Sequence, residues 1–182
     1  PLCSACSKEY ADPLNRRFHA QPNACPRCGP ATWLGTFKDS DAIAQAAAHL
    51  RDGEILALKG IGGFQLLVRA DSIEGIARLR QRKARPTKPV AVMMSSLAQA
   101  SEHVELSLFE SDLLQGSAGP ILLARRRPHS TLAENIAPGL NQIGVMLPTS
   151  PLHYLLMQHL DVPIVATSGN CRDEPIEIEE SA

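Results

Sequence analysis

The chain has 182 residues, of which 44% are hydrophobic and 20% are charged, a composition that predicts one ordinary globular domain with a small appended module. The formal net charge is −1, so no overall electrostatic field favours nucleic acid or a membrane surface. No apolar run reaches the length of a bilayer span, no N-terminal segment resembles a signal peptide, and four of the five cysteines have metal-ligand spacing, which together favour a reducing cytoplasm.

The first predicted element is a four-cysteine module over residues 1–32. Cys3 and Cys6 form one C-x-x-C pair and Cys25 and Cys28 form a second, with 18 residues between the pairs. Two such pairs can complete a tetrahedral Zn²⁺ site that has no open coordination position, which indicates a structural rather than a catalytic metal. Gly29 follows the second pair and permits a positive φ, with which backbone N–H groups could fold back toward sulfur.

Two other interpretations of these cysteines are weaker. Two disulfides would need an oxidising compartment, and a redox-active pair should lie beside a βαβ unit. His19 is a competing ligand in principle, but four thiolates already complete the site, so we expect a packing or surface role. Because residues 1–30 are too few to bury a core, the metal would supply the folding energy.

Residues 33–182 are predicted to form an α/β domain, after an extended connector at residues 33–36. Polar capping residues and 3–4-residue periodicity predict five helices, at residues 42–51, 73 to just before Pro86, 95–103, 107–115 and 151–159. Apolar runs bounded by turn residues predict six strands, at residues 54–59, 64–68, 90–94, 120–125, 143–147 and 162–167. The irregular alternation of strands and helices predicts a mixed, open, twisted sheet.

Basic residues are concentrated where the second of these helices ends. Six cations and no acid occur between residues 78 and 88, namely Arg78, Arg80, Arg82, Lys83, Arg85 and Lys88. Such a run makes sense if it faces an anion, because arginine holds phosphate in a bidentate fork and lysine acts as a point charge. A solvated helix C-terminus, where the helix dipole favours cations, explains the run equally well.

Three further segments carry candidate ligand-binding residues. Lys59–Gly63 is a glycine-rich turn after a strand, which suits either a phosphate or a tight hairpin. Thr167–Asn170 places small polar groups at the carboxyl end of a strand, and Leu147–His153 joins a strand to a helix N-terminus. Thr167–Asn170 can also be a plain turn. His153 is expected to pack or face solvent, and the unpaired Cys171 is expected to be structural.

Taken together, these segments resemble the HypF family, the carbamoyltransferases of NiFe-hydrogenase maturation. Residues 9–30 resemble the family's second zinc finger, and the following residues resemble its YrdC-like domain. The stretches that carry the resemblance are residues 57–66, 79–89, 147–153 and 166–170. The chain begins with Pro1 and ends in the acidic stretch 173–182, so we expect a fragment of a longer polypeptide whose YrdC-like domain is truncated at its C-terminus.

The resemblance implies a specific chemistry. Carbamate derived from carbamoyl phosphate would be joined to ATP, with Mg²⁺, to give carbamoyl-adenylate and pyrophosphate, and the carbamoyl group would pass to HypE through the full-length protein. The family's Lys-x-Arg motif maps onto Lys83 and Arg85, and its Ser-x-Asn motif maps onto Ser168 and Asn170. The resemblance implies that these four residues bind the nucleotide phosphates and the carbamoyl group. Lys59, Thr149 and Ser150 are secondary candidates, because they lie where strands close that could point into the same cleft.

Two alternatives remain open. The tRNA-modifying branch of the same superfamily makes threonylcarbamoyl-adenylate and would require threonine. A zinc and basic-groove module that binds double-stranded RNA, tRNA or a protein would need no ATP, but aromatic residues make up only 4% of the chain and offer few stacking platforms.

Overall fold

The structure is a computed structural model that describes residues 1–170 and 174–179. The chain divides into two compact units, Pro1–Ile43 and Ala44–Ala182, which are described separately. The predicted domain ranges, 1–32 and 33–182, stay a prediction. Cys171 lies outside the described residues. Within the described part of the chain, every helix is too short or too polar to span a membrane.

The N-terminal unit combines one helix, a series of turns and a small hairpin. Helix α1 (Ser4–Ala11) was not predicted, because its polar sequence shows no apolar periodicity. Strands β1 (Trp33–Leu34) and β2 (Phe37–Lys38) pair antiparallel, with Gly35 at a φ of 56° between them. The connector predicted at residues 33–36 is therefore the first half of a hairpin.

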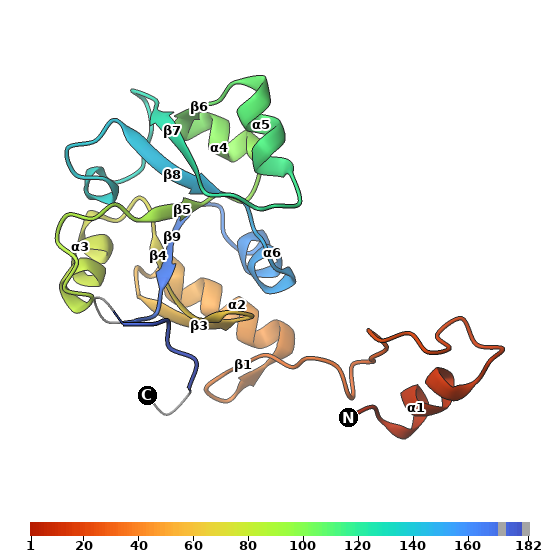
Figure 1. Cartoon of the computed structure of the whole chain (residues 1–182). Helices are drawn as coiled ribbons and strands as arrows, with labels where there is room; N and C mark the ends of the chain where they lie inside the picture. The colour runs from red at the N-terminus through yellow and green to blue at the C-terminus, as the bar shows by residue number, and fades with distance from the viewer. Residues whose placement is uncertain (171–173, 180–182) are drawn as a thin grey trace. The chain divides into compact units, whose positions relative to one another are not determined.

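The C-terminal unit is built on a seven-stranded sheet with the order β3-β4-β9-β5-β8-β7-β6 (Figure 1). Its strands are β3 (Leu56–Gly60), β4 (Gly63–Arg69), β5 (Ala91–Met93), β6 (Val104–Glu105), β7 (Leu122–Arg126), β8 (Gln142–Met146) and β9 (Ile164–Ser168). Only the pair β5–β8 is parallel among these strands, so the predicted mixed sheet is confirmed. The two-residue strand β6 was missed, because it is too short to show alternation.

The helices begin where the sequence supplies capping groups. They are α2 (Asp39–Arg51), α3 (Ile73–Arg82), α4 (Leu97–His103), α5 (Leu108–Gln115) and α6 (Pro151–Gln158), with the 3₁₀ turn η1 (Glu134–Ile136). The Ser72 side chain accepts a hydrogen bond from Gly75 N at the start of α3. Ser107 and Glu110 form the predicted capping box of α5, and Ser150 caps α6, which has Pro151 at its first position.

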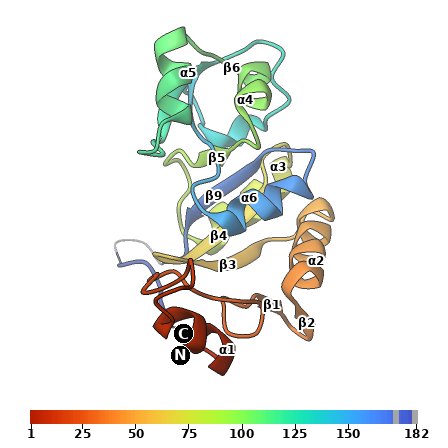
Figure 2. The same ribbon diagram turned by 90° about the vertical axis from the view of Figure 1, so that its right-hand side faces the viewer.

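The central strands β4, β5, β8 and β9 have consecutive buried residues, so both of their faces are covered and neighbouring residues belong to different layers, whereas β3 and β7 expose residues on one face. Val68, Val92 and Val165 belong to a core cluster that includes residues of α3, α4, α5 and η1. Leu67, Met93 and Ile164 are equally buried and, because strand side chains alternate, point to the other face. Figures 1 and 2 show α3 and α6 on opposite sides of β4 and β9.

Candidate functional site

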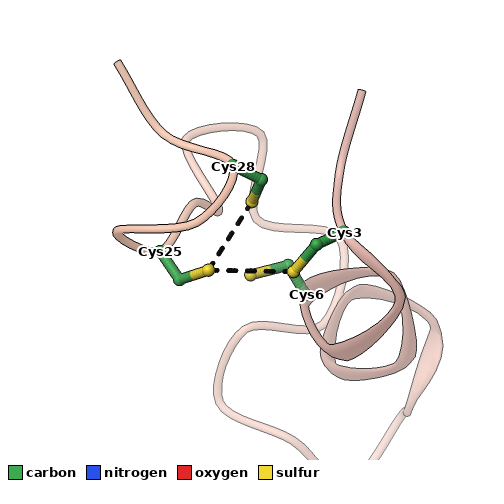
Figure 3. Close-up of side chains that lie close together, drawn as sticks. All are labelled: Cys3, Cys6, Cys25 and Cys28. Carbon is green, nitrogen blue, oxygen red and sulfur yellow. Dashed lines mark hydrogen bonds between the residues drawn. The ribbon is translucent and has the colours of Figure 1, made fainter. Parts of the chain in front are cut away.

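The four predicted metal ligands converge in the N-terminal unit (Figure 3). Cys3 is the N-cap of α1 and Cys6 lies within that helix, while Cys25 and Cys28 lie in a turn. All four Sγ atoms lie within 4.8 Å of one another, with 3.7 Å between Cys3 and Cys25 and 3.8 Å between Cys25 and Cys28. Zn–S bonds of about 2.3 Å place the sulfurs of a tetrahedral site about 3.8 Å apart, so the cluster fits Zn²⁺.

The local electrostatics favour thiolates at part of this cluster. Backbone hydrogen bonds from Cys3 and then Cys25 lower the pKa of Cys28 to about 6. A backbone hydrogen bond at Cys6 lowers the pKa of Cys3, whereas burial raises the pKa of Cys6. Since the thiolate is the metal-binding form, Cys28 and Cys3 are prepared for a cation, and the buried Cys6 would gain most from one. None of these four cysteines is disulfide-bonded, in agreement with the metal interpretation.

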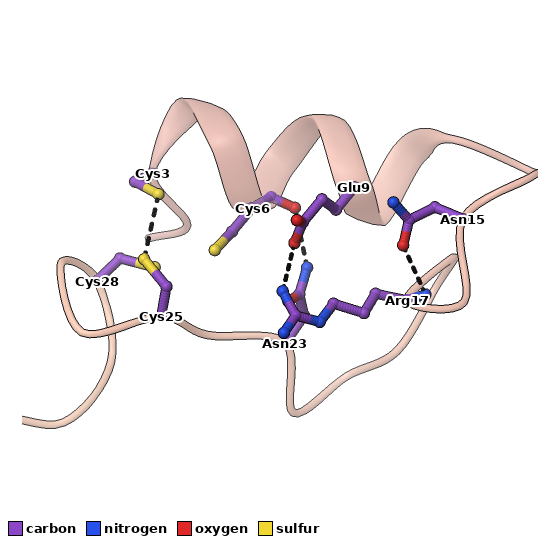
Figure 4. Close-up of polar contacts among 8 residues, drawn as sticks. All are labelled: Cys3, Cys6, Glu9, Asn15, Arg17, Asn23, Cys25 and Cys28. Carbon is purple, nitrogen blue, oxygen red and sulfur yellow. Dashed lines mark hydrogen bonds and ion pairs between the residues drawn. The ribbon is translucent and has the colours of Figure 1, made fainter.

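Polar contacts hold the helix of this module against its turns (Figure 4). Arg17 forms an ion pair of 2.6 Å with Glu9 on α1, and the Arg17 backbone N–H donates to Asn15 Oδ1 at 2.9 Å. The buried Asn23 donates from Nδ2 to the Cys6 carbonyl at 2.9 Å, which fixes the helix turn that carries a ligand.

Two sequence-based expectations for the module have different outcomes. Gly29 does not have the positive φ that glycine permits, so this freedom is not the reason for glycine at this position. Glycine is needed there because a Cβ would lie 2.9 Å from the Cys25 carbonyl oxygen, which accepts from Gly29 N at 2.7 Å. His19 is not part of the sulfur cluster and stacks on Phe18 and Tyr10 with ring centroids 4.0 Å and 5.1 Å away, as expected of a packing histidine.

In the C-terminal unit, the structure brings the predicted Lys-x-Arg and Ser-x-Asn residues together at the carboxyl end of β9. Lys83 is only 7% exposed, and its Nζ donates to the Ser168 carbonyl at 2.5 Å, to the Asn170 carbonyl at 3.0 Å and to Asn170 Oδ1 at 3.1 Å. The Ser168 hydroxyl donates to the same Asn170 Oδ1 at 2.6 Å. Residues 85 or more positions apart therefore form one polar cluster.

Arg85 reaches β9 beside this cluster. Its Nη1 lies 3.5 Å from Thr167 Oγ1, and its Nη2 donates to the Pro89 carbonyl at 2.7 Å. Its buried Nε has no hydrogen-bond partner among the described residues. Arg85 also lines an open cavity of about 360 Å³ with residues that include Ala77, Gln81 and Asn135. Each terminal nitrogen carries two N–H groups and uses one of them in these contacts, so Nη1 and Nη2 keep donor capacity for a ligand.

The end of α3 sets the directions of Lys83 and Arg85. Ala84 has a φ of 47°, a left-handed conformation in which glycine is usual. Ala84 N donates to the Gln81 carbonyl at 3.1 Å and Arg85 N donates to the Arg80 carbonyl at 3.0 Å, which is the Schellman pattern. Ala84 therefore ends the helix between the two cations and sends the chain in a new direction.

The basic run does not face a single anion as a whole. Arg80 is buried, and its guanidinium donates to the backbone carbonyls of Arg85, Pro86, Lys88, Asn135 and Ile136. Arg78 Nη2 donates to the Gly53 carbonyl at 2.5 Å. The sequence allowed two interpretations of the basic run, an anion-binding site or a solvated helix end. Neither describes Arg78 and Arg80, whose guanidinium groups bind backbone carbonyls.

The secondary candidates lie in different places. Lys59 and Ser168 lie near the carboxyl ends of β3 and β9, at the same end of the strands. The register partner of Lys59 is Phe64, and the Lys59 ammonium lies 5.7 Å from the Phe64 ring centroid. Strand β8 is parallel to β5, and β5 is antiparallel to β9. The carboxyl ends of β8 and β9 therefore lie at opposite ends of the strands in the sheet. Thr149 and Ser150 follow β8, so the expectation that they share a cleft with Ser168 because both lie at carboxyl ends of strands has no support from the strand directions.

The described acidic residues after Asn170 are docked on the β3–β4 hairpin. Phe64 N donates to the Glu177 carbonyl at 2.7 Å, and Glu177 N donates to the Gly169 carbonyl at 2.8 Å. A Cβ on Gly63, whose φ is 120°, would lie 2.7 Å from the Glu177 oxygen. The glycine turn is thus a hairpin, and its last glycine leaves room for this segment.

Sequence reasoning missed one buried polar contact. His153 Nε2 lies 2.7 Å from Gln65 Oε1, which joins α6 to β4 beside Ser168. The sequence signal that could have indicated this contact is Gln65, the polar residue in the otherwise apolar strand at residues 64–68.

Comparisons with known proteins agree with this architecture. The Sua5/YciO/YrdC family, described as "Telomere recombination", matches residues 48–182. The chain belongs to the Sua5/YciO/YrdC family. A second family, the HypF finger, matches residues 2–34. The predicted α/β fold with a YrdC-like domain and a four-cysteine finger is therefore confirmed.

The resemblance to HypF is confirmed as well. The chain is 46% identical over 177 residues to the carbamoyltransferase HypF of Rhodobacter capsulatus, covering 96% of this chain and 24% of that protein. A crystal structure of full-length HypF in a phosphate- and nucleotide-bound form superposes with a TM-score of 0.89 at 46% identity, covering 100% of this chain and 24% of that one. The threonylcarbamoyl-AMP synthase of Bacillus subtilis is 26% identical over 136 residues, covering 73% of this chain and 39% of that protein. The chain thus spans about a quarter of the length of the HypF proteins it matches.

Proposed function

We propose that this Sua5/YciO/YrdC domain joins carbamate to ATP and forms carbamoyl-adenylate and pyrophosphate. The observation that carries the proposal is the convergence of Lys83 and Arg85 with Ser168 and Asn170 at one end of β9. The Rhodobacter capsulatus relative named as a carbamoyltransferase, and the HypF structure described as nucleotide-bound, support the same chemistry.

In the proposed reaction, a carbamate oxygen attacks the α-phosphorus of ATP. The new P–O bond forms as the bond between the α-phosphorus and the bridging oxygen to the β-phosphate breaks, and pyrophosphate leaves with that oxygen. Negative charge accumulates on the phosphate oxygens, so fixed donors aimed at them lower the barrier. Arg85 can bind these oxygens through its guanidinium, and Lys83 supplies a positive charge while it holds the Ser168–Asn170 turn. Mg²⁺ bound to ATP would neutralise part of the phosphate charge.

The two remaining parts of the proposal concern the zinc module and the wider protein. We infer that Zn²⁺ bound by Cys3, Cys6, Cys25 and Cys28 is structural, because four thiolates leave no open position. In a protein of the relatives' length, we expect carbamoyl phosphate to supply the carbamate and HypE to receive the carbamoyl group.

Carbamate-dependent exchange of labelled pyrophosphate into ATP tests the proposal. We expect exchange that requires carbamate and falls at least 100-fold in Lys83→Ala, because hydrogen bonds to a charged group contribute about 1.5–3 kcal/mol each. Arg82→Ala is the matched control, since Arg82 is an exposed cation on the same helix. The same assay should be run on a protein of full HypF length. Absence of exchange there, with carbamate or with carbamoyl phosphate, would refute the proposal.

A second candidate is synthesis of threonylcarbamoyl-adenylate, because the Bacillus subtilis relative bears that activity in its name. Exchange that requires threonine as well as carbonate would favour it. If the chain instead binds double-stranded RNA or tRNA without ATP, with affinity that falls steeply as salt rises, the binding-module alternative would hold.

A further inference from the structure

The strand register places a second polar side chain next to Ser168. Gln65 on β4 is the direct partner of Ser168 on β9. Directly opposite residues of an antiparallel pair point to the same face, with Cβ atoms about 5 Å apart. Leu67 and Ala166, one step further along the same two strands, are buried on that face. The Gln65 carboxamide and the Ser168 hydroxyl therefore occupy neighbouring positions on one surface.

His153 fixes the orientation of this carboxamide. It lies in the first turn of α6, is 5% exposed, and has its Nε2 at 2.7 Å from Gln65 Oε1. An amide oxygen only accepts hydrogen bonds, so Nε2 carries the proton and His153 is the donor. Burial lowers the pKa of His153, which keeps the ring neutral near pH 7. The Nδ1 atom is then an acceptor, and it is buried without a partner in the described part of the chain.

With its oxygen engaged by His153, Gln65 is left with two N–H donors. Within residues 1–170 and 174–179, no hydrogen bond involves the Gln65 Nε2 group. Gln65 is partly exposed, and its Nε2 is not among the described buried side-chain atoms that lack a partner, so a ligand can reach these donors. A neutral donor pair beside Ser168, with the Lys83 ammonium bound to the Ser168 carbonyl, suits a small anion that has two acceptor oxygens.

We propose that Gln65 is a substrate-contacting residue that donates its carboxamide N–H groups to the oxygens of carbamate, and that His153 is the residue that positions it. The inference rests on the proposed function, because it names the subsite at which the attacking group of that reaction binds. Neither residue forms or breaks a covalent bond in this scheme. A neutral donor orients the carboxylate without neutralising it, so the oxygen keeps the charge with which it attacks phosphorus.

Kinetics of the zinc-loaded chain test the inference. Gln65→Leu removes the donors, and we expect the KM for carbamate in pyrophosphate exchange to rise about 10- to 100-fold, the effect of losing a hydrogen bond to a charged group. The Kd for ATP, measured by equilibrium dialysis, should stay unchanged. Gln65→Glu keeps an oxygen for His153 but places negative charge beside the anion, so its KM should rise further. Gln142→Leu, at an exposed position of β8, is the matched control.

His153 needs its own variants, since it acts through Gln65. His153→Leu should raise the KM for carbamate in the same way as Gln65→Leu, whereas His153→Gln keeps a donor of similar reach and should restore it. Restoration by glutamine alone identifies the hydrogen bond to Gln65 as the cause. Equal KM values for the leucine and glutamine variants would show that His153 does not position Gln65.

A binding measurement separates failure of this inference from failure of the proposed function. The side-chain amide resonance of Gln65 should shift when ammonium carbamate is added with α,β-methylene-ATP, while that of Gln142 should not. A shift without any exchange would support the carbamate contact and reject the adenylation step. Exchange in the wild type together with an unchanged KM in Gln65→Leu would overturn the inference and leave the proposed function standing. Absence of both exchange and shift would overturn both.

Discussion

Replacement of Arg80 by leucine should destabilise the C-terminal unit more than any other single change in the basic run. Arg80 is 7% exposed and donates to five backbone carbonyls, at distances between 2.8 Å and 3.3 Å. Burial lowers its pKa, but an arginine still remains charged at pH 7. The variant would therefore remove a charged donor from acceptors that lie partly inside the protein.

The size of the loss in the free energy of unfolding depends on how many of the five carbonyls can form another hydrogen bond when Arg80 is absent. Pro86 and Lys88 are exposed, so water can replace arginine there, and the Ile136 carbonyl already accepts from Val90 N at 3.1 Å. The carbonyls of Arg85 and Asn135 lose a charge-assisted bond at partly buried positions. At about 1.5–3 kcal/mol for each of these two bonds, the free energy of unfolding should fall by about 3–6 kcal/mol.

Urea denaturation of the zinc-loaded chain, followed by circular dichroism, measures this loss. Arg82→Leu is the control, because Arg82 is exposed on the same helix and should change the free energy by less than about 0.5 kcal/mol. If Arg80→Leu lost less than about 1 kcal/mol, close to the value for one ordinary hydrogen bond, the bracing role of Arg80 would be rejected.

Three other predictions concern the metal, a strained residue and a buried histidine. Chelation of the metal should unfold residues 1–43 and leave the seven-stranded sheet folded, as amide resonances would show, because a structural zinc contributes about 10–16 kcal/mol to such a module. Co²⁺ substitution should give a tetrahedral thiolate spectrum, and an octahedral one would contradict the site. Because Ala84 has a φ of 47°, Ala84→Gly should raise the free energy of unfolding by about 0.5–1 kcal/mol and Ala84→Val should lower it by more than about 1 kcal/mol. Thermal denaturation that ranks the two variants in the reverse order would refute backbone strain at this residue. Burial lowers the pKa of His153 from 6.5, so its contribution to the free energy of unfolding should be fully present above pH 6.5 and should be lost as the pH falls toward the folded-state pKa, by at most about 1.4 kcal/mol per pH unit. Urea denaturation at several pH values should show a shallower dependence of this free energy on pH in His153→Gln. An unchanged dependence would mean that the ring is not buried as a neutral group.

Local chemistry in the sequence determined most of the secondary structure. The caps at Ser72, Ser107 and Ser150 started helices as expected, because each needs only a side chain and the N–H groups two or three residues away. The C-x-x-C spacing likewise predicted the sulfur cluster, since a single metal geometry accounts for both pairs. Elements without a local signal, such as α1 and the two-residue strand β6, were missed.

The tertiary structure decided what the charged and polar residues do. The sequence placed Arg80 and Lys83 in one basic run, but only the fold shows that Arg80 braces carbonyls 55 residues away while Lys83 reaches the end of β9. The direction of β8 relative to β9 removed the strand-end argument for Thr149 and Ser150, and the β4–β9 register placed Gln65 beside Ser168. Caps and ligand spacings are local, so the sequence alone specifies them. Strand order, register and the partners of buried polar groups depend on contacts between distant segments, which only the folded chain brings together.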